Sequence, residues 1–243
     1  MTSFILCLVL SLAVPMGVES HLTLVNAEHP LPSYYIPEEL ATYNGIQLHP
    51  AAMEAFTQLL AAMEADGIHG LSLHSAYRSY SRQQSLFSRK ASYYKHQGFP
   101  PEEAEALAAR TVQRPGASEH QTGLALDVSS TGQLAQSFGN TPAGLWLQAN
   151  AYRFGFIIRY PCSKTHTTYI IYEPWHLRYV GIPHAEIMHI RDLALEEYAD
   201  FLAAHSPYAF WTATGERFRI YYADTPPKLR YVTTTRMYEN WET

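Results

Sequence analysis

Cysteine is nearly absent from this chain, which has two in 243 residues. Cys7 lies in an apolar N-terminal segment that we expect to be removed, and Cys162 would then stand alone. The shortage of cysteine excludes a fold held together by a disulfide framework. The chain must therefore rely on its hydrophobic core, with help from any metal ion that it binds.

Charge is also sparse. Charged residues make up 16% of the chain and hydrophobic residues 47%, which is typical of a globular protein. The formal net charge is −5, and no segment gathers Lys and Arg in the way that a phosphate backbone requires. This excludes nucleic acid as a partner. The length predicts one sizeable domain with small additions. The sequence implies no dedicated protein partner, and we expect a monomer.

A long apolar run is missing as well. The run from Phe4 to about Val18 is shorter than the roughly 20 residues that a membrane-spanning helix needs. Its length fits the apolar part of a signal peptide, and small residues precede a cut after Ser20. We therefore predict that residues 1–20 are a signal peptide and that the protein is exported. An uncleaved N-terminal anchor is the alternative, because no Lys or Arg precedes the run.

The rest of the chain mixes strands and helices without a regular repeat of strand, helix and strand. Residues 21–48 are rich in Pro and Tyr and indicate an extended arm. Helical periodicity with Pro starts and Gly stops predicts helices at 50–66, 79–97, 101–110, 142–154 and 183–204. Apolar runs and alternation predict strands at 71–78, 123–128, 156–160 and 167–173. This order favours an α+β fold around an antiparallel sheet. Residues 206–243 indicate an added β-hairpin.

Two histidines and two acids carry the chemistry that the sequence suggests. His120 and Asp127 lie seven positions apart, and Glu173 and His176 belong to the segment EPWH. Two His and one carboxylate form a zinc site with an open fourth position, as in catalytic zinc centres. A further carboxylate beside such a site takes a proton from water and returns it to a leaving amine. We expect a strand to deliver Glu173 and a turn at Pro174–Trp175 to present His176.

The sequence motifs around these residues are specific to one protein family. SEHQTGLALD at 118–127 meets the pattern Ser-x-His-x-x-Gly-x-Ala-x-Asp, and EPWHLRYVG at 173–181 meets Glu-Pro-Trp-His followed by Arg-Tyr-Val-Gly. SAYRSYSRQ, FIIRYP and LEEYADFL match as well. In these segments the chain resembles the VanY-type D-alanyl-D-alanine carboxypeptidases, members of the LAS group of zinc peptidases with a hedgehog-like fold. The resemblance implies a catalytic domain at residues 21–205.

The resemblance also implies an activity, namely removal of the C-terminal D-alanine from peptidoglycan stem peptides. It implies one zinc ion per chain, bound by His120, Asp127 and His176. It further implies that Glu173 is the general base and acid. Arg78 would face the substrate carboxylate or the developing oxyanion, which agrees with the bidentate grip of Arg on carboxylates. The substrate-binding residues that it implies are Gln83, Ser118 and Trp175.

Several of these assignments have alternatives. Arg78 could instead cap a helix end, and Trp175 could simply belong to the core. Ala76 and Thr168 stand where the family usually has Gly, and either change could narrow the pocket. The other histidines that we interpret as structural or surface residues are His69, His74, His166, His184 and His189.

Three rival functions use the same residues. An L,D-carboxypeptidase that acts on tetrapeptide stems needs the same site. A silent module that binds zinc and peptide would not need Glu173. A structural zinc domain would usually use four protein ligands, and Cys162 offers no fourth. The sequence leaves open the choice between D,D and L,D specificity and the role of residues 206–243.

Overall fold

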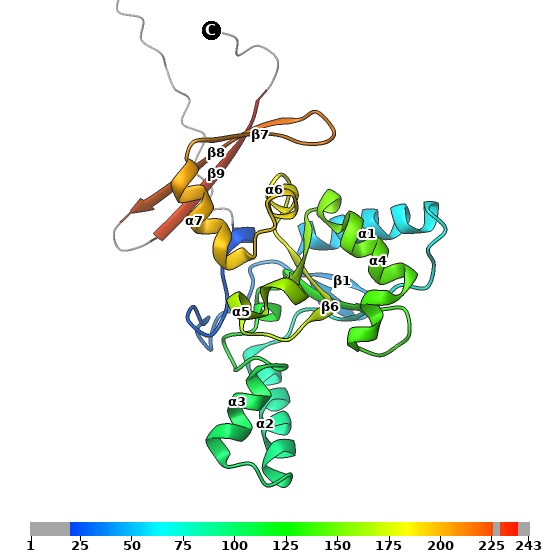
Figure 1. Cartoon of the computed structure of the whole chain (residues 1–243), viewed down its shortest axis with the longest axis vertical. Helices are drawn as coiled ribbons and strands as arrows, with labels where there is room; N and C mark the ends of the chain where they lie inside the picture. The colour runs from blue at the N-terminus through cyan, green and yellow to red at the C-terminus, as the bar shows by residue number, and fades with distance from the viewer. Residues whose placement is uncertain (1–19, 226–228, 238–243) are drawn as a thin grey trace, which may run out of the picture.

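A four-stranded antiparallel sheet lies at the centre of the protein. The structure, a computed structural model, describes residues 20–225 and 229–237 (Figure 1). The strand order is β3-β4-β6-β5, and every neighbouring pair is antiparallel. The strands are β3 (Ser72–Ser75), β4 (Ala125–Ser129), β5 (Phe156–Tyr160) and β6 (Glu173–Tyr179). The prediction of an α+β fold around an antiparallel sheet is confirmed.

Helices surround this sheet, and two of them form a hairpin that projects from the domain (Figure 1). The projecting pair is α2 (Tyr80–His96) and α3 (Pro101–Ala109). The remaining helices are α1 (Pro50–Ala65), α4 (Pro142–Asn150), α5 (Thr165–Thr168), α6 (His184–Arg191) and α7 (Leu195–His205). The N-terminal arm lacks regular structure except for a short 3-10 turn at Ser20–Leu22 and the hairpin of β1 (Ala41–Tyr43) and β2 (Ile46–Leu48).

Local sequence sets the bounds of α1. Pro50 occupies its first turn, where its missing N–H leaves no gap in the hydrogen bonding. The His49 side chain accepts a hydrogen bond from the Ala51 backbone N–H at 3.3 Å. Gly67 follows the helix end with a left-handed φ of +75°. The predicted start and stop of this helix are therefore confirmed.

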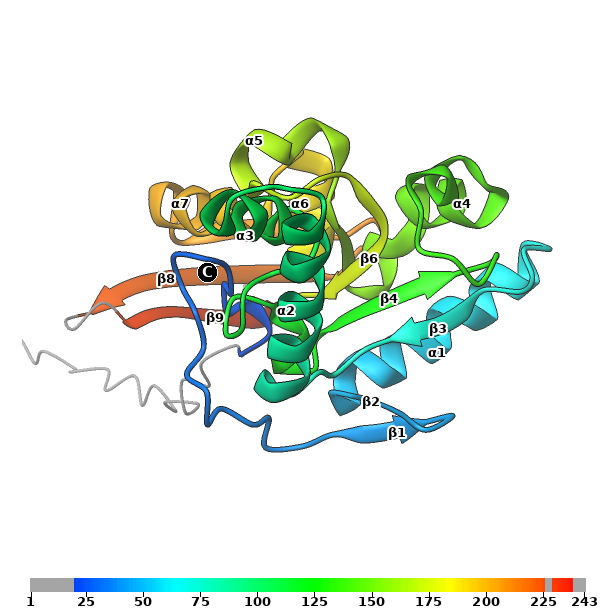
Figure 2. The same cartoon turned by 90° about the horizontal axis from the view of Figure 1, so that it is seen from below.

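One face of the sheet packs against α1 and α4 and forms the main hydrophobic core. Figure 2 shows α1 lying along β3 and β4. Leu126 and Val128 of β4, with Trp175 and Leu177 of β6, point into this core. Because side chains alternate along a strand, the residues between them point to the opposite face. The same period of two that builds the core therefore delivers polar side chains to the other side of the sheet.

Residues 167–173 do not form the predicted strand. They belong to α5 and to a loop in which Tyr169 has a left-handed φ of 58°, and β6 begins only at Glu173. The Thr168 hydroxyl donates to the Lys164 carbonyl at 3.1 Å and accepts from the Ile170 N–H at 3.4 Å. Such local side-chain bonds compete with a strand ladder. The predicted turn at 174–175 was also wrong, because EPWH is the first half of a strand.

The predicted helix at 183–204 is two helices. Asp192 ends α6 in a left-handed conformation with φ of 50°, which Asp tolerates better than most residues. The Glu197 carboxylate then accepts a hydrogen bond from the Ala194 N–H at 2.7 Å and starts α7. Continuous helical periodicity hid this break, because the capping residues lie within the amphipathic pattern.

A three-stranded sheet follows α7 where a hairpin was predicted. The strands β8 (Arg217–Thr225) and β9 (Leu229–Met237) form the hairpin, and β7 (Tyr208–Trp211) pairs with the other edge of β8. Ile220 of β8 packs with Tyr198 and Leu202 of α7 in a second core. The boundary between residues 205 and 206 stays a prediction.

The predicted signal peptide at residues 1–20 lies, except for Ser20, outside the described residues. Within the described part of the chain, no helix has both the length and the apolar character that a membrane crossing requires. The arm that follows Ser20 is anchored by Val25, which is fully buried.

Candidate active site

His120, Asp127 and His176 meet on the face of the sheet opposite the main core. Asp127 on β4 and His176 on β6 are direct partners across the two strands, so their side chains lie side by side. His120 comes from a 3-10 turn at 119–122 that leads into β4. Gly123 ends this turn with φ of +72°, and a Cβ there would lie 2.8 Å from a side-chain carbon of Leu40. This turn therefore requires glycine in order to place His120 beside β4.

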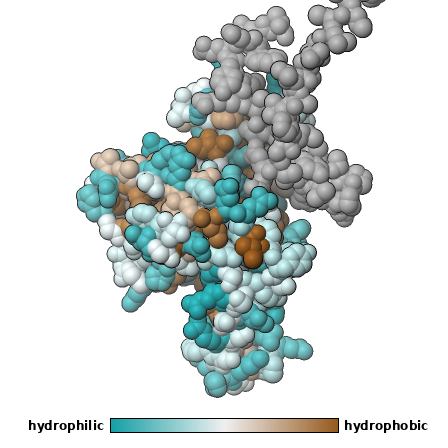
Figure 3. All heavy atoms as spheres, turned by 180° about the vertical axis from the view of Figure 1, so that it is seen from behind, coloured by the Kyte–Doolittle hydropathy of each residue, from teal (hydrophilic) through white to brown (hydrophobic). Residues whose placement is uncertain are grey.

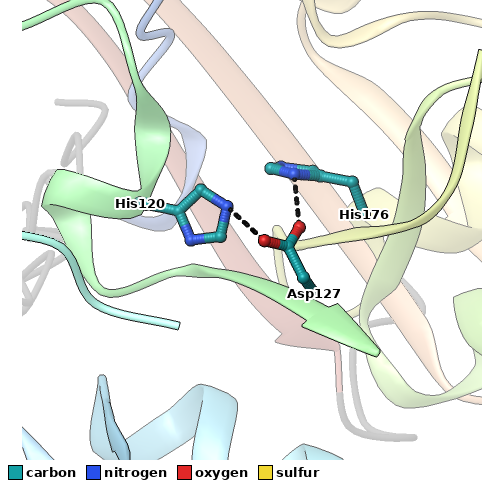
Figure 4. A group of neighbouring side chains, drawn as sticks. All are labelled: His120, Asp127 and His176. Atoms are coloured by element: carbon teal, nitrogen blue, oxygen red, sulfur yellow. Dashed lines mark ion pairs between the residues drawn. The ribbon is translucent and has the colours of Figure 1, made fainter. Parts of the chain in front are cut away.

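One atom from each of these three side chains converges on a common point (Figure 4). The three atoms lie within 4.8 Å of one another. His120 Nε2 is 3.3 Å from one carboxylate oxygen of Asp127, and His176 Nδ1 is 3.1 Å from the other. All three residues are buried. Two imidazole nitrogens and a carboxylate are the donor set of catalytic zinc centres, so these residues fit a zinc ion.

Protein groups fix the second ring nitrogen of both histidines. His120 Nδ1 lies 2.6 Å from the carbonyl oxygen of Ala76, and His176 Nε2 lies 3.1 Å from the carboxylate of Glu119. A carbonyl and a carboxylate can only accept, so these nitrogens carry the hydrogens. His120 Nε2 and His176 Nδ1 are then the ligand atoms. His120 Nε2 is buried and has no hydrogen-bond partner among the described residues, since its 3.3 Å approach to Asp127 is an ion-pair contact, as expected of an atom reserved for a metal ion.

The Glu119 carboxylate is itself held by two fully buried arginines. Arg159 Nε and Arg178 Nη1 each donate to Glu119 Oε2 at 2.9 Å. Burial alone would raise the pKa of this carboxyl, but the charges of Arg178 and Arg159 hold it far below its usual range. Glu119 therefore stays ionised and remains an acceptor for the His176 ring.

Both arginines have further anchors away from the site. Arg159 donates to the two carboxylate oxygens of Glu196, in the first turn of α7, at 2.6 and 2.8 Å. Arg178 donates to the backbone carbonyls of His21 and Thr23 at 2.9 and 2.7 Å. The support of the metal site therefore extends to α7 and to the N-terminal arm.

The three ligand side chains differ in how easily they lose a proton. Burial, together with the charge of Arg78, lowers the pKa of His120 to about 4. Burial would also lower the pKa of His176, but its hydrogen bonds to Asp127 and Glu119 raise it to about 9. The pKa of Asp127 is well below its usual range because both histidines outweigh the effect of burial. A metal ion that binds near neutral pH must therefore displace a proton from His176.

Glu173 and Arg78 flank the ligand cluster. Glu173 Oε2 is 3.9 Å from His176 Nδ1, and Arg78 Nη2 is 3.9 Å from Asp127 Oδ2. Burial raises the pKa of Glu173 to about 8 in spite of the positive charges nearby. A carboxyl with a pKa in this range, next to a metal-binding position, is suited to accept a proton and return it.

A cleft of about 30 Å³ opens beside the cluster. Arg78, Gln83, Ser118, Tyr160 and Glu173 are among the residues that line it. Arg78 Nε and Gln83 Oε1 are buried and have no hydrogen-bond partner among the described residues. A buried polar atom without a partner is costly, so these two atoms indicate a place for a polar ligand.

The structure brings most of the predicted site residues together, but not Trp175. Gln83 and Ser118 line the cleft together with the ligands His120 and His176. Trp175 is 9% exposed and packs in the main core, because alternation along β6 points it away from the ligand face. Its contact with substrate stays a prediction. Arg78 precedes α2 without capping it, since the cap is Ser79.

The two departures from the family pattern have local roles. Ala76 supplies the carbonyl that orients a ligand histidine, and its side chain lies in the main core. Thr168 lies in α5 and donates a hydrogen bond to the Lys164 carbonyl. Among the other histidines, His184 is buried and 2.8 Å from the Tyr198 hydroxyl, which fits a structural role.

Sequence reasoning missed the support formed by Glu119, Arg159 and Arg178. The two arginines did leave a signal, because each is a charge inside an apolar strand, where burial demands an ionic partner. Glu119 left none. An acid next to a ligand in a turn usually faces solvent, and only the packing of three elements buries it.

Known proteins are similar to this chain in both sequence and fold. The family model for VanY, D-alanyl-D-alanine carboxypeptidase, matches residues 45–182. A protein from Enterococcus faecalis named D-alanyl-D-alanine carboxypeptidase is 41% identical over 180 residues, which cover 74% of this chain and 66% of that one. The chain thus spans about two thirds of the length of this relative.

Two solved structures are similar over most of their length. One is the vancomycin resistance D,D-pentapeptidase VanY from a VanB-type cassette, a mutant in complex with Zn(II). It has a TM-score of 0.66 and 41% identity, and the match covers 73% of this chain and 98% of that one. The other is the LdcB LD-carboxypeptidase, with a TM-score of 0.66, 39% identity and coverage of 75% and 86%. The ligand set, the fold and the matched sequence agree, and the chain belongs to the VanY family of D-alanyl-D-alanine carboxypeptidases.

Proposed function

We propose that this chain is a zinc-dependent carboxypeptidase that removes the C-terminal D-alanine from peptidoglycan stem peptides. One observation carries the proposal, namely the meeting of three chemical elements in one cleft. These are a zinc donor set, the buried carboxyl of Glu173, and the guanidinium of Arg78, whose Nε has no hydrogen-bond partner in the described part of the chain. A carboxypeptidase needs a Lewis acid, a proton carrier and a receptor for the terminal carboxylate. Its relatives in Enterococcus support the choice of substrate.

His120, Asp127 and His176 would hold the zinc ion. The chemistry that zinc supplies when bound is Lewis acidity, which polarises a carbonyl and brings the pKa of water to about 7. Glu173 accepts the proton that the attacking water loses. It then returns this proton to the nitrogen of the departing D-alanine as the peptide bond breaks. The charge of a bound zinc ion would lower the pKa of Glu173 from its raised value, so that the carboxyl would begin and end each cycle in the ionised form.

Arg78 and Gln83 would bind the end of the peptide. A guanidinium donates two parallel hydrogen bonds to a planar carboxylate, which suits a substrate that ends in one. Gln83 Nε2 already donates to the Gln113 carbonyl at 2.6 Å. This bond fixes the amide so that Gln83 Oε1 remains to accept from a substrate N–H. The orientation of the terminal D-alanine then follows from these two side chains.

An L,D-carboxypeptidase that acts on tetrapeptide stems is the second candidate. The specific observation in its favour is the similarity to LdcB, named an LD-carboxypeptidase, which is nearly as high as the similarity to VanY. The two reactions release the same amino acid. They differ in the length of the stem peptide and in the residue before the cleaved bond, which has the D configuration in the pentapeptide and the L configuration in the tetrapeptide.

Mass spectrometry of digested stem peptides separates these functions. The zinc-loaded protein is incubated with a pentapeptide and, separately, with a tetrapeptide. Loss of one alanine from the pentapeptide supports the D,D activity, and loss from the tetrapeptide supports the L,D activity. The Glu173→Gln variant serves as a control for contaminating peptidases. Intact peptides in both reactions would overturn the carboxypeptidase proposal.

We further propose that the protein is exported and acts as a monomer in the cell envelope or outside the cell. The apolar run from Phe4 to about Val18 supports export, because its length is that of a signal peptide. The proposed substrate also lies outside the cytoplasm. N-terminal sequencing of protein from the envelope and the medium should find a start at His21. Retention in the cytoplasm would contradict export, and light scattering at twice the expected mass would contradict the monomer.

A further inference from the structure

Helix α2 carries an unbalanced positive charge. Its 17 residues include Arg82, Arg89, Lys90 and Lys95 but no Asp or Glu, in a chain whose formal net charge is −5. Lys95 is paired with Glu105 of α3 at 3.6 Å. Among the described side chains of residues 20–222, no carboxylate forms an ion pair with the other three cations. A peptide or polymer with negative charge is the natural counterpart of such a helix.

The three unpaired cations share one exposed side of α2. The buried side of the helix faces α3 and the body of the domain. Residues three or four apart lie on one side of a helix, and Leu86 and Tyr93 fall among the cations at this spacing. Lys90 Nζ is 5.4 Å from the centres of the Tyr93 and Tyr94 rings, which hold the ammonium group on this side. We name as the α2 basic face the residues Arg82, Leu86, Arg89, Lys90 and Tyr93.

This face begins at the active-site cleft. Gln83, the neighbour of Arg82, lines the cleft. Val112 lines both the cleft and an open hollow formed with Leu86, Arg89, Lys90 and Tyr93. Figure 1 shows α2 running from the body of the domain to the tip of the projecting hairpin, and Figure 3 shows this projection as mainly hydrophilic. A ligand that leaves the cleft along α2 therefore passes unpaired positive charge.

We propose that the α2 basic face binds the acidic residue of the peptidoglycan stem peptide, upstream of the cleaved bond. The inference rests on the proposed function and adds a determinant of specificity to it. Stem pentapeptides carry a free carboxylate on the residue three positions before the terminal D-alanine. An extended peptide advances about 3.3–3.6 Å per residue, which places this carboxylate roughly 10 Å from the end. From Gln83, which lines the cleft, to Lys90 the helix rises about 10 Å, so the two lengths match.

Two pentapeptides that differ in one charge test the proposal. One has the free carboxylate, and in the other this carboxylate is amidated. The variant is the double charge reversal Arg89→Glu with Lys90→Glu. The matched control is Arg219→Glu, an exposed position on β8 in the C-terminal sheet. Melting temperature and zinc content of each variant report whether it folds, and the single variant Arg89→Glu replaces the double one if it does not.

At low salt we expect the parent protein to prefer the acidic peptide by about two- to fivefold in kcat/KM for each ion pair formed. The preference should come from a lower KM for the acidic peptide, with kcat unchanged, and it should become smaller at high salt. The double variant should lose or invert it, and the Arg219→Glu control should keep it. Equal kcat/KM for both peptides in the parent protein, or a preference that survives the charge reversal, would overturn the proposal.

A binding experiment separates this proposal from the proposed function. Calorimetric titration of the zinc-loaded protein with each peptide measures affinity whether or not a peptide is cleaved. If the parent protein cleaves neither peptide but binds the acidic one more tightly than the amidated one, the proposed function is wrong. The proposal that the α2 basic face binds the acidic residue is then still supported. If the parent protein cleaves both peptides at equal rates and binds them equally, the proposed function stands and the α2 basic face fails.

Discussion

The Glu119→Gln substitution tests whether the metal site depends on a charge that does not touch the metal. Glu119 accepts from Arg159, Arg178 and His176 at 2.9–3.1 Å. Gln has the same size but only one acceptor oxygen. If its oxygen faces the arginines, its NH2 group opposes the His176 Nε2–H. If it faces His176, the NH2 group opposes two buried cations.

The loss of stability follows from the partners that remain. Arg159 keeps the Glu196 carboxylate, but Arg178 keeps only backbone carbonyls. Breaking a buried ion pair from one side costs about 3–5 kcal/mol, because the other charge is left uncompensated. This is a large part of the about 5–15 kcal/mol that stabilises a typical domain. We expect the variant to fold but to unfold at a clearly lower denaturant concentration.

The loss of zinc affinity follows from the His176 ring. Removing a group that orients a metal-bound histidine typically weakens metal binding by about 10–100-fold. At the same excess of zinc, the metal should then add about 1.4–2.7 kcal/mol less stability to the variant than to the parent protein. This second effect distinguishes a residue that positions the ligand from one that only stabilises the fold.

Denaturant unfolding of Glu119→Gln and the parent protein, each with a chelator and with zinc, measures both effects. Competition with a chromophoric chelator gives the zinc affinity directly. The control is Glu105→Gln, which removes an exposed carboxylate paired with Lys95 and Arg114 and should leave zinc affinity unchanged. An equal gain in stability from zinc in the parent protein and in Glu119→Gln would refute the role of Glu119.

Three further predictions concern the residues that meet the metal and the substrate. Glu173→Gln should keep its zinc but lose about 10²–10⁴-fold in turnover, and loss of zinc by atomic absorption would instead make Glu173 a ligand. Arg78→Lys should lower kcat/KM on peptides by about tenfold or more, since the fork that grips a carboxylate is lost, and an unchanged value would make Arg78 structural. Zinc affinity should rise about tenfold per pH unit up to about pH 9 and then level off, because below that pH zinc must displace the His176 proton. A chelator competition series that is flat between pH 6 and 8 would contradict this.

The sequence indicated the ligand set through short local motifs and through the family resemblance that they carry. Asp127 lies at the end of an apolar run, where an unpaired acid would be costly, and His176 follows Glu173 by three residues in the segment EPWH. The helix bounds with Pro at the start and Gly at the stop, as in α1, are also local. These features need no knowledge of what packs against them.

The sequence failed where two local patterns compete. TTYIIY alternates like a strand, yet hydroxyl bonds to the backbone turn it into α5 and a loop. The segment 183–204 has one helical period, yet Asp192 and Glu197 end one helix and start another inside it. Side-chain bonds of Thr168 and Glu197 to the backbone, and the left-handed backbone of Asp192, outweigh the hydrophobic period at these places, and a period count detects none of them.

Only the tertiary structure decided how the parts meet. The register between β4 and β6 sets Asp127 directly opposite His176, and register depends on the partner strand and not on either strand alone. The burial of Glu119 between Arg159 and Arg178 depends on a turn, two strands, α7 and the N-terminal arm at once. The types of the catalytic residues are therefore written in short segments of the sequence. Their geometry, and the charges that hold them, arise only from contacts between residues far apart in the chain.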